Sequence, residues 1–124
     1  MPFETPENLA TLALFLDVDG TLVPIAANPA AVRPDPALPA LLEGAAKRLA
    51  GALAIVSGRE IDSIDQLTGG AVHYLAGSHG AEFRLGADQP VLRPEPQPNL
   101  AGLVAEASRL AEAWPEVLIE PKRA

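Results

Sequence analysis

Three short, mostly apolar runs recur along the first two thirds of the chain, and each ends at a polar or glycine-containing turn. They occupy residues 12–16, 53–56 and 72–75. The first reads Leu-Ala-Leu-Phe-Leu without one polar position, which is typical of a strand that is buried on both faces of a parallel sheet. We therefore predict three strands at these positions, the first of them buried.

Two helices are predicted between these runs. Apolar residues recur at helical spacing over residues 38–49, with Asp35 as the N-cap, Pro36 at the first helical position and Gly51 closing the helix. A shorter helix is predicted over residues 61–67. The order strand, helix, strand, helix, strand indicates an α/β fold with a Rossmann-like parallel sheet and crossover helices.

The pattern changes after the third strand. Residues 82–85 and 91–93 are predicted to pair as a hairpin, and the proline-rich stretch 94–98 is predicted to be a linker.

A second module is predicted to begin after this linker. Asn99 is expected to cap a helix that stops near Trp114, and residues 117–119 are expected to start a strand. The predicted domains are therefore residues 1–97, the front part of an α/β core, and residues 98–124, the beginning of a second module.

Charge and composition narrow the function further. The 124 residues carry a net charge of −7 and include no cysteine. A thiolate metal site is excluded, and neither nucleic acid nor an anionic membrane is an expected partner for so acidic a chain. The start of the chain is acidic, at Glu4 and Glu7, whereas a signal peptide begins with basic residues. We expect a cytoplasmic protein.

Polar residues gather where the predicted strands end. Asp17 and Asp19 follow the first strand, Ser57 follows the second, and His79 lies in a glycine-flanked turn after the third. Ligands of open α/β sheets bind beyond the carboxyl ends of the strands. These three segments are therefore expected to converge on one site.

Two carboxylates at a strand end suit phosphoryl transfer. Asp17 could attack phosphorus to form an aspartyl-phosphate, while Asp19 protonates the leaving oxygen and later activates water. Mg²⁺ fits such a pair, because it favours one or two carboxylates together with substrate phosphate and water. Gly20 lets the chain turn, and Thr21 adds a hydroxyl at the same point. A calcium loop is excluded because Gly20 stands at the fourth position rather than the sixth.

Specific motifs carry a family resemblance. The stretch 17–23, Asp-Val-Asp-Gly-Thr-Leu-Val, resembles the first motif of the haloacid dehalogenase (HAD) superfamily, and the stretch 56–59, Val-Ser-Gly-Arg, resembles the second. With residues 77–82, Gly-Ser-His-Gly-Ala-Glu, the pattern is most similar to trehalose-6-phosphate phosphatases. The resemblance implies a Mg²⁺-dependent sugar-phosphate phosphatase whose front half is present here. It also implies that residues 98–124 are the beginning of the family's α/β cap.

The resemblance also implies roles for individual residues. Asp17 is the expected nucleophile and Asp19 the expected acid/base, and both are expected to hold the metal. The phosphate-binding residues it implies are Thr21, Ser57 and Gly58. The substrate-binding residues it implies are Arg59, His79, Glu82, Glu120 and Lys122.

Several alternatives stay open. A lysine from a later segment and a downstream acidic pair, both expected from the resemblance, have no counterpart in the sequence. We therefore expect a truncated chain whose natural partner is the C-terminal half of the same fold. The substrate could be another sugar phosphate, such as a sucrose-phosphate type. The chain could also be a catalytically incomplete module that only binds. A phosphoacceptor receiver domain is disfavoured, because its acceptor aspartate normally lacks the Asp-Gly-Thr sequence that follows Asp17 and Val18 here.

Overall fold

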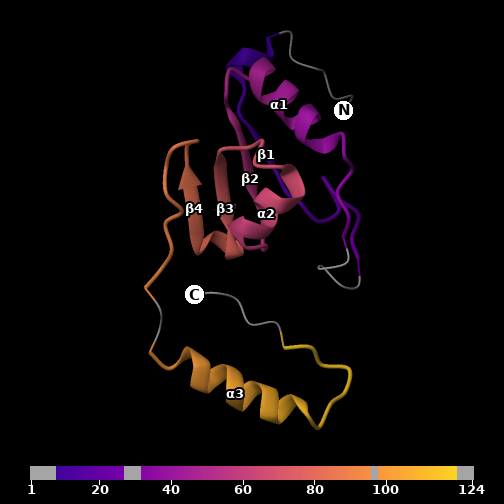
Figure 1. Cartoon of the computed structure of the whole chain (residues 1–124), viewed down its shortest axis with the longest axis vertical. Coiled ribbons are helices and arrows are strands. Elements are labelled where there is room, and N and C mark those ends of the chain that lie inside the picture. Colours follow the sequence, from indigo (N-terminus) through magenta and orange to yellow (C-terminus); the bar gives the residue numbers. More distant parts are fainter. Residues whose placement is uncertain (1–7, 27–31, 96–97, 120–124) are drawn as a thin grey trace, which may run out of the picture.

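The structure is a computed structural model that describes residues 8–26, 32–95 and 98–119 (Figure 1). Its elements in chain order are η1 (Leu9–Thr11), β1 (Leu14–Leu16), α1 (Leu38–Arg48), β2 (Leu53–Val56), α2 (Ile61–Thr68), β3 (Tyr74–Gly77), η3 (Ser78–Gly80), β4 (Glu82–Leu85) and α3 (Leu100–Ala111). Within these ranges no helix is long and apolar enough to cross a membrane.

The strands form one four-stranded sheet in the order β1-β2-β3-β4. β1, β2 and β3 are parallel, which confirms the predicted α/β arrangement with α1 and α2 as crossover helices. β4 runs antiparallel to β3, because the tight turn of η3 reverses the chain directly after Gly77. The predicted hairpin survives only as a bridge between Phe83 and Leu92, so the main partner of residues 82–85 is β3 instead.

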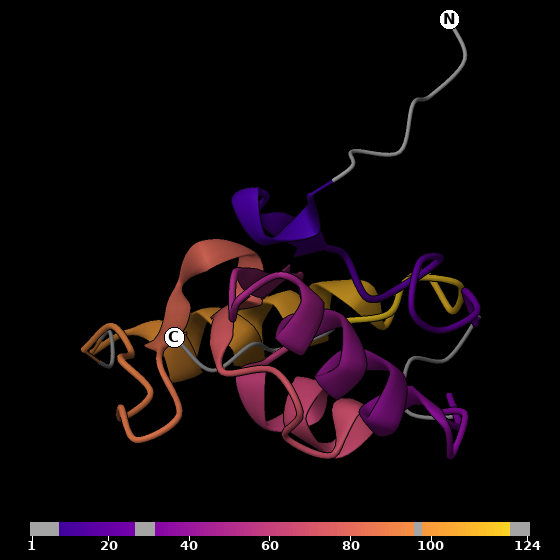
Figure 2. The ribbon, with the colours of Figure 1, turned by 90° about the horizontal axis from the view of Figure 1, so that it is seen from above.

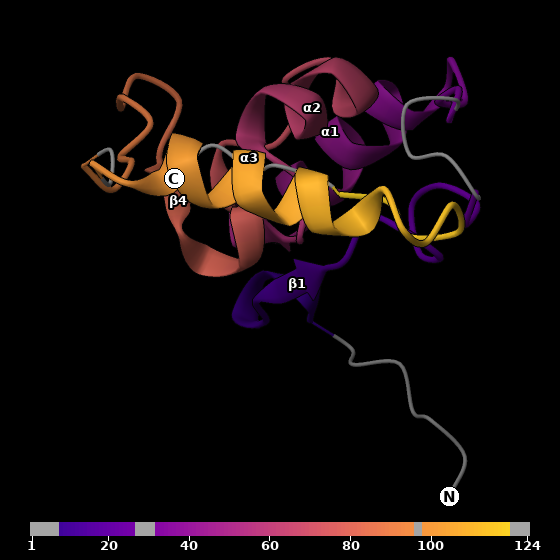
Figure 3. The same cartoon turned by 90° about the horizontal axis from the view of Figure 1, so that it is seen from below.

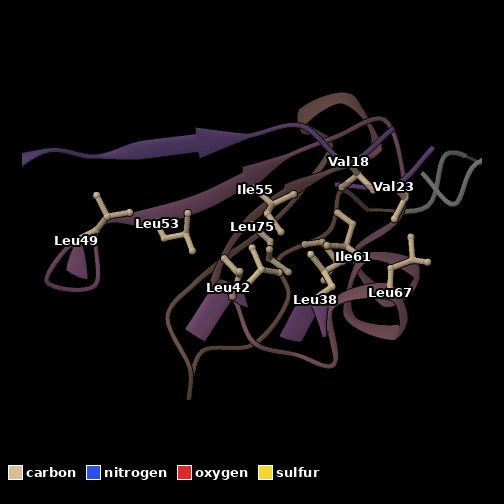
Figure 4. Packing of buried hydrophobic residues seen from close by; sticks show 12 residues of the cluster. Val18, Val23, Leu38, Leu42, Leu49, Leu53, Ile55, Ile61, Leu67 and Leu75 are labelled. Atoms are coloured by element: carbon tan, nitrogen blue, oxygen red, sulfur yellow. The ribbon is translucent and has the colours of Figure 1, made fainter. Parts of the chain in front are cut away.

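Both crossover helices cover the same face of the sheet, as Figures 2 and 3 show from opposite sides. Alternate residues of the strands point to this face and are buried against the helices (Figure 4). The buried core consists of Val18, Val23, Leu38, Leu42, Leu49, Leu53, Ile55, Ile61, Ile64, Leu67, Val72 and Leu75.

The other face of the sheet is open and apolar. Phe15 is 69% exposed, and Val56, Tyr74 and Leu85, which the strand registers place on the same face, are also exposed. A hollow of about 1050 Å³ lies along this face and the amino ends of the strands. The prediction that the first strand is buried on both faces is therefore wrong for this chain. The reason is that no described element packs on this face, and β2 is the only described strand with which β1 pairs.

Local hydrogen bonds set the ends of the helices. The Asp35 carboxylate accepts the Ala37 N–H at 2.8 Å, so it caps the turn before α1, and the helix begins at Leu38 rather than at Pro36. α2 ends at Gly69, which adopts the left-handed conformation with φ 64°, as is common for the residue that closes a helix.

α3 lies across the carboxyl ends of the parallel strands in Figures 1 and 3, apart from the helices that pack on the sheet. None of its residues is buried, and Asn99, although it is the N-cap, makes no side-chain capping hydrogen bond. Residues 117–119 are not a strand, contrary to the prediction, because no described strand pairs with them. The domain boundary at residue 98 stays a prediction.

One ion pair ties β4 to α2. The Arg84 side chain is 14% exposed and donates to both carboxylate oxygens of Asp65, at 2.7 and 2.8 Å, and to the Val72 carbonyl at 3.0 Å. The hydrogen bond with Asp65 raises the pKa of Arg84, so the guanidinium stays charged.

Replacing Arg84 with methionine should lower the free energy of unfolding by about 2 kcal/mol, because it removes charge-assisted hydrogen bonds in a mostly buried place. Urea denaturation followed by circular dichroism measures the loss. Arg109→Met is the matched control, because the Arg109–Glu106 pair on α3 is well exposed and should change stability little. Equal losses of stability in the two variants would contradict the proposed contribution of the Arg84–Asp65 ion pair.

Candidate active site

The first loop of the site begins where β1 ends. Asp17 is exposed, and its Oδ1 accepts the Val18 N–H at 2.7 Å. The chain then turns through Gly20, whose φ of 84° suits glycine, and the buried side chains of Val18 and Val23 hold the turn in the core. The two carboxylates are thus presented beyond the strand while the loop beneath them is fixed.

The second loop follows β2 and approaches the first. Ser57 is buried, and its Oγ accepts the Arg59 N–H at 3.2 Å. The Arg59 guanidinium donates from Nε and Nη2 to the two carboxylate oxygens of Asp19, at 2.8 and 2.7 Å. This two-point contact joins residues that are forty positions apart, and it places Asp19 beside the Ser57 loop, as the sequence predicted.

The third loop, η3, packs on the second. The His79 N–H donates to the Ser57 carbonyl at 3.2 Å, and the Ser78 N–H donates to the Arg59 carbonyl at 2.8 Å. The His79 ring lies against Gly58, where an added Cβ would come within 2.5 Å of the ring. Gly58 therefore leaves room for the ring, which a larger side chain at this position would displace.

Backbone strain is concentrated in this third loop. Ser78 and His79 both have positive φ, 48° and 56°, a conformation that is uncommon outside glycine and often found at functional sites. The buried Ser78 hydroxyl is also without a hydrogen-bond partner among the described residues. Sequence reasoning selected His79 but missed Ser78, for which the glycine-flanked turn was the only signal.

The other predicted site residues differ in exposure, and two of them lie outside the described part of the chain. Thr21 is exposed in the turn after Asp19. Glu82 is fully buried, and its carboxylate accepts hydrogen bonds from Ile61 and Arg93, so it does not face the other site residues as an open group. Glu120 and Lys122 lie outside the described residues. The hollow on the open face is lined by none of these side chains, so the chemistry is assigned from the converging loops and not from that hollow.

The comparisons with known proteins agree with this geometry. The family model described as trehalose-phosphatase matches residues 15–106, which include all three loops. The chain belongs to the trehalose-phosphatase family. It is 44% identical over 117 residues to a probable trehalose-phosphate phosphatase of Sinorhizobium fredii, covering 94% of this chain and 44% of that protein. It is 45% identical over 82 residues to the trehalose-6-phosphate phosphatase of Escherichia coli, covering 65% of this chain and 30% of that protein.

Solved structures of trehalose phosphatases share the fold. A trehalose-6-phosphate phosphatase related protein superimposes with a TM-score of 0.62 at 25% identity, over 88% of this chain and 47% of that chain. The Aspergillus fumigatus trehalose-6-phosphate phosphatase gives a TM-score of 0.53 at 28% identity, over 88% of this chain and 42% of that chain. The chain thus spans less than half the length of these trehalose phosphatases, and within that span the predicted α/β fold is confirmed.

Proposed function

We propose that this chain carries the catalytic front of a phosphatase that hydrolyses trehalose 6-phosphate to trehalose and phosphate. The observation that supports this most directly is the contact between Arg59 and Asp19 beside the exposed Asp17. It brings the two carboxylates and the Ser57 loop to one edge of the sheet, in a chain of the trehalose-phosphatase family. Phosphoryl transfer needs such a grouping of nucleophile, proton donor and phosphate-binding groups.

The proposed reaction has two steps. In the first, an Asp17 carboxylate oxygen bonds to phosphorus, the bond from phosphorus to the sugar oxygen breaks, and Asp19 gives its proton to that oxygen. In the second, Asp19 takes a proton from water, and the water oxygen displaces Asp17 from phosphorus. Phosphate is released, and both aspartates return to their starting forms.

Arg59 connects substrate binding with the proton transfer. Its two-point contact favours the charged form of Asp19, which is the form that accepts a proton from water in the second step. To donate a proton in the first step, Asp19 must lose this contact and take up a proton from solvent. We propose that Arg59 turns toward the bound sugar phosphate and thereby releases Asp19.

The other residues divide between the two ends of the substrate. Thr21, Ser57 and Gly58 are proposed to bind the phosphate, because they lie in the two loops that flank the carboxylates. His79 is proposed to contact the sugar, since it is exposed at the same edge. Glu120 and Lys122 are proposed to contact the sugar on the strength of the motif alone.

Magnesium is part of the proposal. Among the described residues no group of three acidic or histidine side chains could hold a metal ion alone. The exposed Asp17 nevertheless fits Mg²⁺, which commonly takes one or two carboxylates and completes its shell with phosphate and water. Asp19 would add a second carboxylate once its two oxygens are released from Arg59. When bound, the ion would offset the repulsion between the Asp17 carboxylate and the phosphate dianion.

The rest of a trehalose phosphatase is the proposed partner of the open face. Parallel sheets are normally covered on both faces, whereas Phe15 and Leu85 are more than half exposed here. The Sinorhizobium fredii relative has more than half its length beyond the matched segment. Neither nucleic acid nor a membrane is proposed as a partner. The cytoplasm is the proposed location.

A panel of phosphate esters tests the proposal. Phosphate release should be fastest with trehalose 6-phosphate and should require Mg²⁺. It should exceed phosphate release from sucrose 6-phosphate and from glucose 6-phosphate by about tenfold or more, since each missing sugar contact costs roughly 1–3 kcal/mol. Faster release from sucrose 6-phosphate would support the sucrose-phosphate type instead.

A binding module is the second candidate. It is favoured because these 124 residues offer no counterpart of the lysine and the downstream acidic pair that the resemblance implies. In that case titration calorimetry would detect binding of trehalose 6-phosphate while no phosphate ester on the panel is hydrolysed. If the chain neither binds trehalose 6-phosphate nor hydrolyses any ester on the panel, both candidate functions are contradicted.

A further inference from the structure

Glu82 is a buried carboxylate that the proposed reaction does not use. It is 0% exposed, and both of its oxygens accept hydrogen bonds. Oε2 accepts the backbone N–H of Ile61 at 2.9 Å, and Oε1 accepts the Arg93 Nε–H at 3.0 Å. Arg93 also donates to Asp62 at 3.0 Å, so one guanidinium spans two carboxylates. A charge so fully removed from water is retained only where it is paired, and these contacts pair it.

The contact with Ile61 caps α2 from a distant part of the chain. Ile61 is the first residue of α2, and Glu60, at the N-cap position, makes no side-chain capping hydrogen bond. Glu82 therefore supplies an acceptor for one of the backbone N–H groups that the helix leaves unsatisfied. A negative charge at the N-terminus of a helix is also favourable with respect to the helix dipole.

The same contact lies two residues from the arginine of the active site. The backbone of Arg59 itself makes two hydrogen bonds: its N–H donates to Ser57 Oγ at 3.2 Å, and its carbonyl accepts the Ser78 N–H at 2.8 Å. Two residues further along the chain, Glu82 holds the backbone at Ile61. The Arg59 guanidinium thus reaches Asp19 from a backbone with three anchors, and Glu82 supplies the one at the start of α2.

We propose that Glu82 is a positioning residue that holds Arg59 at Asp19 before substrate binds, by fixing the N-terminus of α2. Any effect of Glu82 on turnover, through Arg59 and Asp19, rests on the proposed function. The structural coupling between Glu82 and Arg59 does not rest on it. The carboxylate is required because both partners of Glu82 are donors. A glutamine of the same shape would offer one acceptor and turn its NH₂ group toward a second donor.

Side-chain hydrogen exchange tests this coupling in the 124-residue chain without a need for turnover. In Glu82→Gln, the Nε–H of Arg59, followed by nitrogen-15 NMR, should exchange about tenfold faster or more, because its contact with Asp19 opens more often. Asp65→Asn is the matched control. It disturbs a two-point ion pair of the same helix in the same way but is remote from the Arg59 backbone, and it should leave the exchange of Arg59 unchanged.

Two results would overturn the proposal. One is unchanged exchange of Arg59 in folded Glu82→Gln, and the other is equal acceleration in Glu82→Gln and Asp65→Asn, which would reveal only a general loosening of α2. If Glu82→Gln does not fold, Glu82→Asp replaces it, since this change keeps the carboxylate but shortens the side chain by one methylene and so draws it away from the Ile61 N–H. Faster exchange in that variant supports the coupling, and unchanged exchange refutes it. Inactivity toward trehalose 6-phosphate with the coupling intact would contradict the proposed function alone.

Discussion

Replacing Asp17 with asparagine should abolish phosphoryl transfer, with a loss of activity toward trehalose 6-phosphate of about three orders of magnitude or more. An amide cannot form the aspartyl-phosphate, so the first step has no nucleophile. Beryllofluoride with Mg²⁺ gives a readout that does not depend on turnover, because it mimics the acyl-phosphate on a reactive aspartate. Fluorine-19 NMR should show the bound species in the unchanged chain and not in Asp17→Asn.

Folding should not account for this loss. Asp17 is exposed, and its side chain accepts one described hydrogen bond, from the neighbouring Val18. Asp88→Asn is the matched control, since Asp88 is an exposed carboxylate outside the three loops, and it should retain the bound fluorine signal. A signal that persists in Asp17→Asn would disprove the assignment of the nucleophile, and no signal in the unchanged chain would favour the binding module.

Replacing Gly77, the last residue of β3, with alanine should destabilise the protein strongly. A Cβ there would lie 2.8 Å from the Arg59 carbonyl oxygen and 2.9 Å from Ile61 Cγ1. Neither neighbour can move freely, because the first is backbone and the second belongs to the fully buried Ile61 side chain. The φ of Gly77 is −111°, so the expected loss is steric and not a matter of backbone strain. Chemical denaturation should show a loss of roughly 2–4 kcal/mol.

Gly44→Ala separates this effect from the general effect of adding a methyl group. Gly44 lies inside α1 with no heavy atom within 4 Å of an added Cβ. Alanine there should stabilise the protein by about 0.5–1 kcal/mol through helix propensity. If Gly77→Ala unfolds at the same denaturant concentration as the unchanged chain, the close packing of β3 on the Arg59 loop is wrong.

The order of elements could be predicted because it depends on neighbours in sequence. The apolar spacing in α1 and α2, and the glycine that ends α2, act within a few residues, so the parallel α/β arrangement followed from the pattern. The same holds for the gathering of the three loops, since the carboxyl ends of parallel strands meet at one edge. The exposure of β1 could not be predicted in this way, because an apolar run indicates what a strand would bury and not whether anything covers it.

The sequence by itself thus determined the α/β fold and the pair of carboxylates at the end of β1, because strand, turn and helix signals are local. Tertiary structure alone decided the antiparallel pairing of β4, the contact of Arg59 with Asp19 and the burial of Glu82 against Ile61. Arg59 and Asp19 are 40 positions apart in the sequence, and Ile61 and Glu82 are 21 positions apart. Their partners are set by how the strands and α2 pack, and no spacing of residue types along the chain records that packing.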